Sequence, residues 1–114
     1  MDEADRWREA LHALRAEVET DLEAGAEGEA TVELDQTRVG RVSRMDALQS
    51  QAMSAAANRR RRLMLTRIDA ALERVARDAF GTCIACGEPI AEARLTADPT
   101  VLRCIDCAEQ GERN

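Results

Sequence analysis

The sequence predicts a mainly α-helical protein, a long antiparallel two-helix coiled-coil hairpin followed by a small C-terminal four-cysteine zinc finger. The 114-residue chain is rich in Ala, Arg and Glu, and its only aromatic residues are Trp7 and Phe80. This composition favours long helices with a narrow apolar seam over a thick core. Apolar residues recur at helical spacing before residue 80, and all four cysteines follow it, in two C-x-x-C pairs.

We expect the first helix over residues 3–24. Its apolar residues recur every three or four positions and so share one stripe, formed by Trp7, Leu11, Leu14, Val18 and Leu22. Gly25 and Gly28 make a continuation of the helix costly. We therefore expect the helix to end there and a tip region to occupy about residues 25–43.

We expect the second helix over about residues 44–79, a stretch that contains no Gly or Pro. Its start falls between Asp35, a candidate cap, and Ser43, which forms a Ser43-x-x-Asp46 sequence similar to a capping box. Gly81 suits a left-handed cap after the end of the helix. The expected seam consists of Leu48, Ala52, Ala55, Leu65, Ile68, Leu72, Val75 and Ala79. The hairpin then occupies residues 1–79, and the finger with its tail occupies residues 80–114.

The cysteines follow the pattern Cys83-x2-Cys86-x17-Cys104-x2-Cys107. Two close pairs separated by such a loop suit one tetrahedral zinc ion bound by four thiolates. Residues 80–114 lack helical periodicity, so they would not fold on a core of their own, and a metal would supply the missing stability. We expect one structural Zn²⁺ rather than four reduced thiols.

Neither this site nor the rest of the chain predicts catalysis. A catalytic zinc usually keeps three protein ligands and an open position, whereas four cysteines would fill the coordination sphere. His12, the only histidine, is far from the cysteines in sequence and fits a surface or seam position. We find no nucleophile–base pair or phosphate-binding loop, and we expect that the protein is not an enzyme.

The net charge of −6 is unevenly distributed along the chain. Residues 1–35 carry a net charge of −9, residues 36–80 carry +6 and residues 81–114 carry −3. Affinity for duplex DNA comes mainly from neutralising phosphates, and between Cys83 and Cys107 acidic residues outnumber arginines. We therefore expect no direct sequence-specific DNA binding.

The chain has no apolar run near the ~20 residues that cross a bilayer. Its acidic N-terminal stretch lacks the apolar segment of a secretion signal. We expect a cytoplasmic monomer without membrane contact. In that compartment, paired cysteines bind metal more often than they form disulfides.

The stretch FGTCIACGEPIAEARLTADPTVLRCIDCAE resembles the zinc finger of the DksA/TraR family of bacterial transcription regulators. The shared elements are the four cysteines at their spacing, Phe80-Gly81, Gly87, Ile90, Arg94-Leu95, Ala97, Pro99 and the CIDC sequence itself. The preceding helix, from about Asn58, matches the family in style. Residues 1–42 match it only in architecture.

The resemblance implies a protein that binds RNA polymerase directly, without DNA, and inserts a coiled-coil tip into the secondary channel. Acidic tip residues act there near the catalytic magnesium and modulate initiation. Counted without gaps, the family tip motif D-x-x-D-x-A falls on Gly40, Ser43 and Met45, which do not match it. A shift of three residues places the second acid at Asp46. We take Asp35 and Asp46 as candidate tip acids, with helix capping as the alternative role of each.

The resemblance also implies a surface for the alarmone guanosine tetraphosphate (ppGpp). The phosphate-binding positions of the family fall on Arg67, Asp98 and Ala108. Arg67 suits this role, but an aspartate would repel polyphosphate. We therefore expect weak or no ppGpp binding.

Four consecutive arginines, Arg59, Arg60, Arg61 and Arg62, cover all sides of the second helix. They form either a solvated face that pairs with the acidic first helix or, with Arg67, a contact for polymerase or a ligand. An alternative function is a nucleic-acid-binding zinc protein that uses this run. A third is a redox or metal-buffering protein that uses the C-x-x-C pairs.

Overall fold

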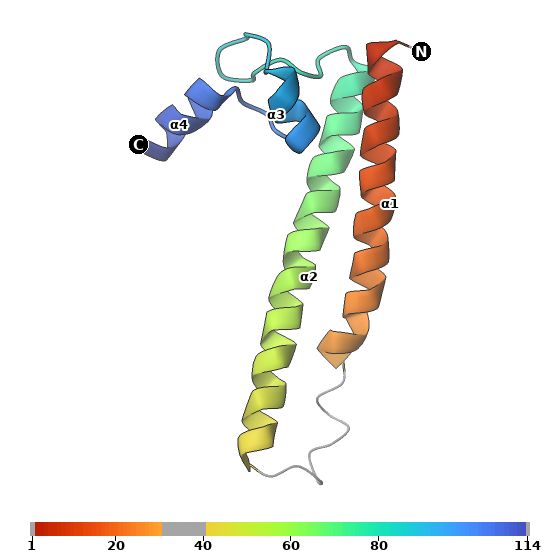
Figure 1. The fold of residues 1–114 in the computed structure, drawn as a ribbon, viewed down its shortest axis with the longest axis vertical. Coiled ribbons are helices and arrows are strands. Elements are labelled where there is room, and N and C mark those ends of the chain that lie inside the picture. Colours follow the sequence, from red (N-terminus) through yellow and green to blue (C-terminus); the bar gives the residue numbers. More distant parts are fainter. Residues whose placement is uncertain (1, 31–40, 114) are drawn as a thin grey trace. The chain divides into compact units, whose positions relative to one another are not determined.

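The structure, a computed structural model, describes residues 2–30 and 41–113. These residues form four helices and no extended strand (Figure 1). The helices are α1 (Glu3–Ala30), α2 (Arg41–Ala76), α3 (Glu92–Ala97) and α4 (Ile105–Arg113). Among the described residues, none of the helices is both long enough and apolar enough to cross a membrane.

The chain divides into two compact units. The finger unit consists of Met1–Leu14 and Arg67–Asn114, and the hairpin unit consists of Arg15–Thr66. In each unit a segment of α1 lies beside a segment of α2 that runs in the opposite direction (Figure 1). The predicted fold class, two long antiparallel helices with a four-cysteine finger at the C-terminal end, is confirmed.

The division into units does not follow the expected boundary at residue 79. The finger is grouped with the first residues of α1 and the last residues of α2. Two contacts explain this grouping. The rings of Trp7 and Phe80 lie 5.3 Å apart between centroids, and Arg6 forms an ion pair with Glu92 of α3.

The stripe predicted on α1 supplies buried side chains in both units. Trp7 and Leu11 are buried in the finger unit, and Val18 is buried in the hairpin unit. The remaining apolar core of the finger unit is contributed by α2 and by the finger, through Ile68, Ala71, Val75, Ile90 and Leu95. Asp2 caps the start of α1, because its Oδ1 accepts a hydrogen bond from the backbone N–H of Asp5 at 2.8 Å.

The prediction that α1 ends near residue 24 is wrong, because α1 continues to Ala30. Gly25 serves close helix packing instead of helix termination. The carbonyl oxygen of Gly25 accepts a hydrogen bond from Nδ2 of the buried Asn58 on α2 at 3.0 Å. A Cβ atom at Gly25 would lie 2.3 Å from Oδ1 of Asn58, so only glycine lets the two helices approach this closely.

Helix α2 begins at Arg41, inside the window predicted between Asp35 and Ser43, and ends at Ala76, three residues before the predicted end at residue 79. Ser43 therefore lies within the helix, and the proposed capping box of Ser43 and Asp46 is wrong. The residue that caps the helix is Asp78, with φ 56°; Gly81 also has a positive φ, 84°, but lies five residues beyond the last helical residue. The backbone N–H of Ala79 donates to the carbonyl of Arg74 at 2.9 Å, and that of Asp78 donates to the carbonyl of Val75, which together form a Schellman motif.

In the first half of the seam predicted on α2, the prediction is wrong for Leu48, which is 48% exposed, and for Ala52, which is exposed, whereas Ala55 is half-buried. In the hairpin unit the buried face of α2 contains Asn58. Leu48 precedes Asn58 by ten residues, which rotates it about 80° away from Asn58 around the helix axis. The second half of the prediction holds for Ile68 and Val75, which are buried.

Candidate functional site

The four cysteines meet in the finger unit, although the two pairs are far apart in sequence. Their Sγ atoms all lie within 4.8 Å of one another, and those of Cys86 and Cys104 are 3.8 Å apart. A tetrahedral zinc ion with four Zn–S bonds of about 2.3 Å requires sulfur–sulfur distances of about 3.8 Å. The geometry therefore fits one four-coordinate zinc ion.

The first cysteine pair lies on a tight turn between Thr82 and Pro89, which form an isolated antiparallel bridge. The N–H of Cys83 donates to the carbonyl of Glu88 at 2.8 Å, and the N–H of Gly87 donates to the carbonyl of Cys83 at 3.0 Å. Gly87 has φ +77°, a conformation that side chains rarely adopt. This glycine thus allows the turn that directs both sulfurs to one point.

The second pair lies at the start of α4, because Cys104 precedes the helix and Cys107 is in its first turn. The two pairs are joined by a hydrogen bond from the N–H of Ile84 to the carbonyl of Leu102, at 2.9 Å. Sequence periodicity gave no signal for α3 or α4. Both helices are short, six residues in α3 and nine in α4, so an apolar position recurs too few times for periodicity to reveal them.

Protonation of the cysteines also fits a metal site. A backbone hydrogen bond from Cys104, with weaker ones from Cys86 and Ala85, lowers the pKa of Cys83 to about 6. Side-chain hydrogen bonds with Cys104, Cys86 and Cys83 raise the pKa of Cys107 to about 12. Ionisation of one thiol therefore opposes ionisation of its neighbours, and a bound Zn²⁺ would supply the compensating charge.

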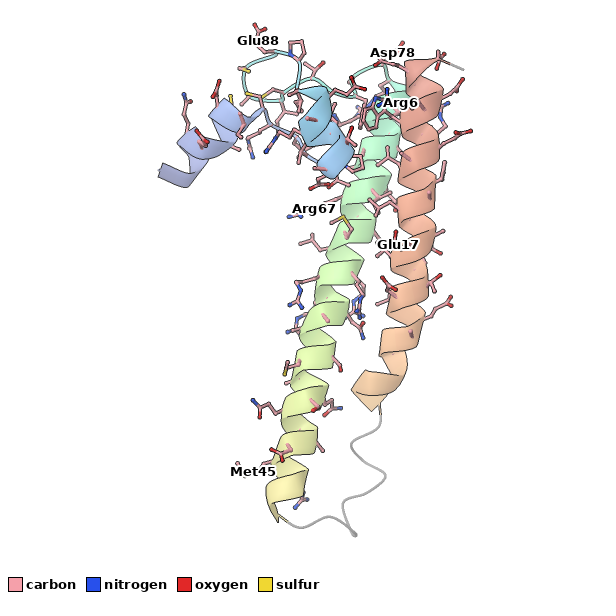
Figure 2. All side chains as sticks on the ribbon, in the orientation of Figure 1. Arg6, Glu17, Met45, Arg67, Asp78 and Glu88 are labelled. Atoms are coloured by element: carbon pink, nitrogen blue, oxygen red, sulfur yellow. The ribbon has the colours of Figure 1, made fainter. Side chains whose placement is uncertain are left out.

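The two candidate tip acids differ in what the structure shows. Asp35 lies outside the described residues. Asp46 is exposed on α2, five positions after the first residue of the helix, so helix capping does not account for it. Its neighbour Met45, labelled near the start of α2 in Figure 2, is 65% exposed.

The four consecutive arginines do not form one uniform cluster. Arg59, Arg60 and Arg62 are exposed. Arg61 is half-buried, and its Nη1 donates a hydrogen bond to Oδ1 of Asn58 at 2.7 Å. At least one arginine of the run therefore supports the packing of α1 against α2 in the hairpin unit.

The three positions implied as alarmone contacts, Arg67, Asp98 and Ala108, line one cavity of ≈ 630 Å³ in the finger unit. Arg67 projects from α2 on the side that carries α3 (Figure 2). The same cavity is lined by Arg94 and Arg103, which sequence reasoning did not assign to this surface. Their convergence depends on α3 and on the loop after it, where Nε of Arg94 donates to the carbonyl of Arg103 at 3.0 Å.

Asp98 has a structural role within that cavity. Its Oδ1 accepts hydrogen bonds from the backbone N–H of Thr100 at 3.0 Å and from the hydroxyl of Thr100 at 2.6 Å. The carboxylate therefore holds the loop after α3, and it also places a negative charge among the arginines.

Comparisons with known proteins confirm the resemblance suggested by the finger. Residues 79–113 match the model of the prokaryotic DksA/TraR C4-type zinc finger. The chain is 47% identical over 49 residues to an uncharacterised protein of Aquifex aeolicus, a match that covers 43% of this chain and 34% of the relative. It is 43% identical over 53 residues to the RNA polymerase-binding transcription factor DksA of Haemophilus influenzae, covering 46% of this chain and 37% of that protein.

The similarity extends beyond the finger at the level of structure. The transcription factor DksA2 from Pseudomonas aeruginosa superimposes with a TM-score of 0.83 at 29% sequence identity, over 98% of this chain and 86% of that one. The curated relatives match over about a third of their own length, whereas the structural match includes both long helices. The match to a C4-type zinc finger and the close approach of the four cysteines together fit one structural zinc ion.

Proposed function

With a DksA/TraR-type finger and a matching helical fold as the premise, we propose that the protein is a transcription regulator that binds RNA polymerase directly. In this proposal it inserts the end of the hairpin between α1 and α2 into the secondary channel and modulates initiation. The observation that carries the proposal is the similarity to Pseudomonas DksA2 over 98% of the chain. The name of the Haemophilus relative, an RNA polymerase-binding factor, supports the choice of partner.

We further propose that Asp46 and Asp35 act on the polymerase active site. The exposure of Asp46 and its position inside α2 support a role other than helix capping. A carboxylate delivered near the catalytic magnesium would alter the coordination or the mobility of groups around the metal. The finger would then have a structural role, in which zinc stabilises the finger unit, which contains the start of α1 and the end of α2.

In vitro transcription with purified polymerase tests this proposal. We expect the wild type to change transcript yield from responsive promoters, and Asp46→Asn and Asp35→Asn to lose most of that effect while they still bind polymerase in a pull-down. Glu73→Gln, which removes another exposed carboxylate from α2, is the matched control and should behave as wild type. Absence of polymerase binding by the wild type would contradict the proposal.

The alternative function is nucleic-acid binding through the arginine run. The exposure of Arg59 and Arg60 favours it, while the hydrogen bond of Arg61 to Asn58 engages one guanidinium of the run within the protein. Retention of polymerase without DNA supports the first proposal. Salt-sensitive DNA binding in the absence of polymerase, lost in an Arg59→Ala/Arg60→Ala variant, supports the second.

A further inference from the structure

The finger unit contains a second cavity, which the proposed function does not use. Its volume is ≈ 320 Å³. It lies where the first turns of α1, the end of α2, the start of the finger and α3 meet. Its floor is apolar and includes the buried residues Trp7, Val75, Ile90 and Leu95. We call this cavity the aromatic pocket, because the only Trp and the only Phe of the chain both line it.

The rim of the aromatic pocket is acidic. Glu3, Asp78 and Glu92 line it, all three are exposed, and no arginine or histidine is among its lining residues. Glu92 pairs with Arg6. Within the part of the chain that the structure describes, the carboxylates of Glu3 and Asp78 form no ion pair. The pocket therefore combines an apolar floor with uncompensated negative charge.

Arg6 shows which kind of group this combination accepts. Its guanidinium carbon lies 4.8 Å from the centroid of the Trp7 ring, and its Nη2 lies 2.6 Å from Oε1 of Glu92. Figure 2 shows Arg6 and Asp78 at the same end of the finger unit. One guanidinium thus already uses an aromatic face and a rim carboxylate next to the pocket, while Glu3 and Asp78 have no cationic partner among the described residues.

We propose that the aromatic pocket is a docking site for an arginine side chain of a partner protein. An arginine has an aliphatic stem that suits the apolar floor and a planar guanidinium that stacks on aromatic rings and pairs with carboxylates. A lysine ammonium is a compact, strongly hydrated charge and uses the aromatic floor less well. The proposal does not depend on polymerase as the partner, since it is carried by residues that the proposed function does not use.

Titration with a capped tripeptide, acetyl-Gly-Arg-Gly-amide, tests the proposal by NMR on the zinc-loaded full chain. Trp7 is the only tryptophan, so its single indole N–H signal reports on the pocket floor. We expect a saturable shift of this signal. The same tripeptide with citrulline, which keeps the shape of arginine but is neutral, should produce little change. Equal shifts with both peptides, or none with either, would overturn the proposal.

Charge-neutralising variants test the role of the rim. We expect Glu3→Gln/Asp78→Asn to weaken the association by about 2- to 25-fold, the combined effect of two exposed ion pairs. Asparagine tolerates the left-handed backbone of Asp78. Glu9→Gln removes an exposed acid of α1 that does not line the pocket, and should leave the affinity unchanged. Equal weakening in both variants would indicate general charge attraction and reject the site. Zinc content and circular dichroism confirm that each variant is folded.

Discussion

At the scale of single residues, the cysteines carry the clearest chemical prediction. A proton competes with zinc for each sulfur, so metal affinity falls as pH falls. The lowered pKa of Cys83, about 6 against an ordinary 9.0, stabilises the metal-free fold fully above pH 9.0, and this contribution is lost as pH falls through about 6. The raised pKa of Cys107 has the opposite sign, and its contribution is lost as pH rises toward about 12.

We therefore expect zinc to be retained at neutral pH and released as pH falls from about 7 to about 5. A chromophoric chelator measures the released metal, and thiolate absorbance near 240 nm in the metal-free protein should show the first thiolate forming near pH 6. Loss of one ligand should have the same effect as protonation. Cys104→Ser should therefore release as much zinc at neutral pH as the wild type releases at low pH. Full retention at low pH would contradict four-thiolate binding.

Asp98 carries a second prediction at this scale. In the cavity with Arg67, Arg94 and Arg103, its negative charge opposes polyphosphate, so we expect calorimetry to detect weak or no binding of ppGpp. Asp98→Asn removes the charge and keeps an oxygen that accepts the two hydrogen bonds from Thr100. We expect this variant to bind more tightly, and Arg67→Ala in the same background to abolish the gain. Micromolar binding by the wild type that depends on Arg67 would contradict the prediction.

At the scale of helices, the contact of Gly25 with Asn58 predicts that replacing this glycine by alanine does not stabilise the protein, in contrast to the usual effect of this substitution in a helix. Alanine at an exposed helical position stabilises by about 1 kcal/mol relative to glycine. At Gly25, a Cβ atom 2.3 Å from Oδ1 of Asn58 forces this buried amide to move and lose hydrogen bonds. Leaving a buried polar group unsatisfied costs about 1–3 kcal/mol, so Gly25→Ala should be neutral to destabilising by about 2 kcal/mol.

Chemical denaturation measures this change, with Gly111→Ala as the control. Gly111 lies in α4 and a Cβ there would meet nothing within 4 Å, so its substitution should stabilise or be neutral. Asn58→Ala should relieve the clash and partly restore the stability of Gly25→Ala. If Gly25→Ala stabilised the protein as much as an exposed site would, the packing role of Gly25 would be refuted.

The helices also show why their ends were harder to predict than their existence. The spacing of Trp7, Leu11 and Val18 identified α1, since periodicity reflects burial on one face. Its continuation past Gly25 accompanies a contact with Asn58, thirty-three residues later in the chain, and no local pattern reveals such a contact. At the end of α2, the capping position fell on Asp78, whereas Gly81, which also has a positive φ, belongs to the turn that follows.

At the scale of the whole molecule, the fold class and the clustering of the four cysteines were predictable because both rest on spacing within the chain. The cysteine pattern specified four sulfurs around one ion, and the structure places them together. The arginine-lined cavity and the aromatic pocket were not predictable. Each combines residues from α2 with residues from the finger that converge only after folding.

The placement of aromatic residues has an optical consequence for folding experiments. Trp7 and Phe80 lie together in the finger unit, so intrinsic fluorescence reports on that unit alone, whereas far-ultraviolet circular dichroism sums the helices of both. We expect a chelator to lower the melting midpoint seen by fluorescence by at least about 10 °C, and the midpoint seen by dichroism by less. Equal shifts by both probes would mean that the two units melt as one, so a single tryptophan makes their cooperativity directly measurable.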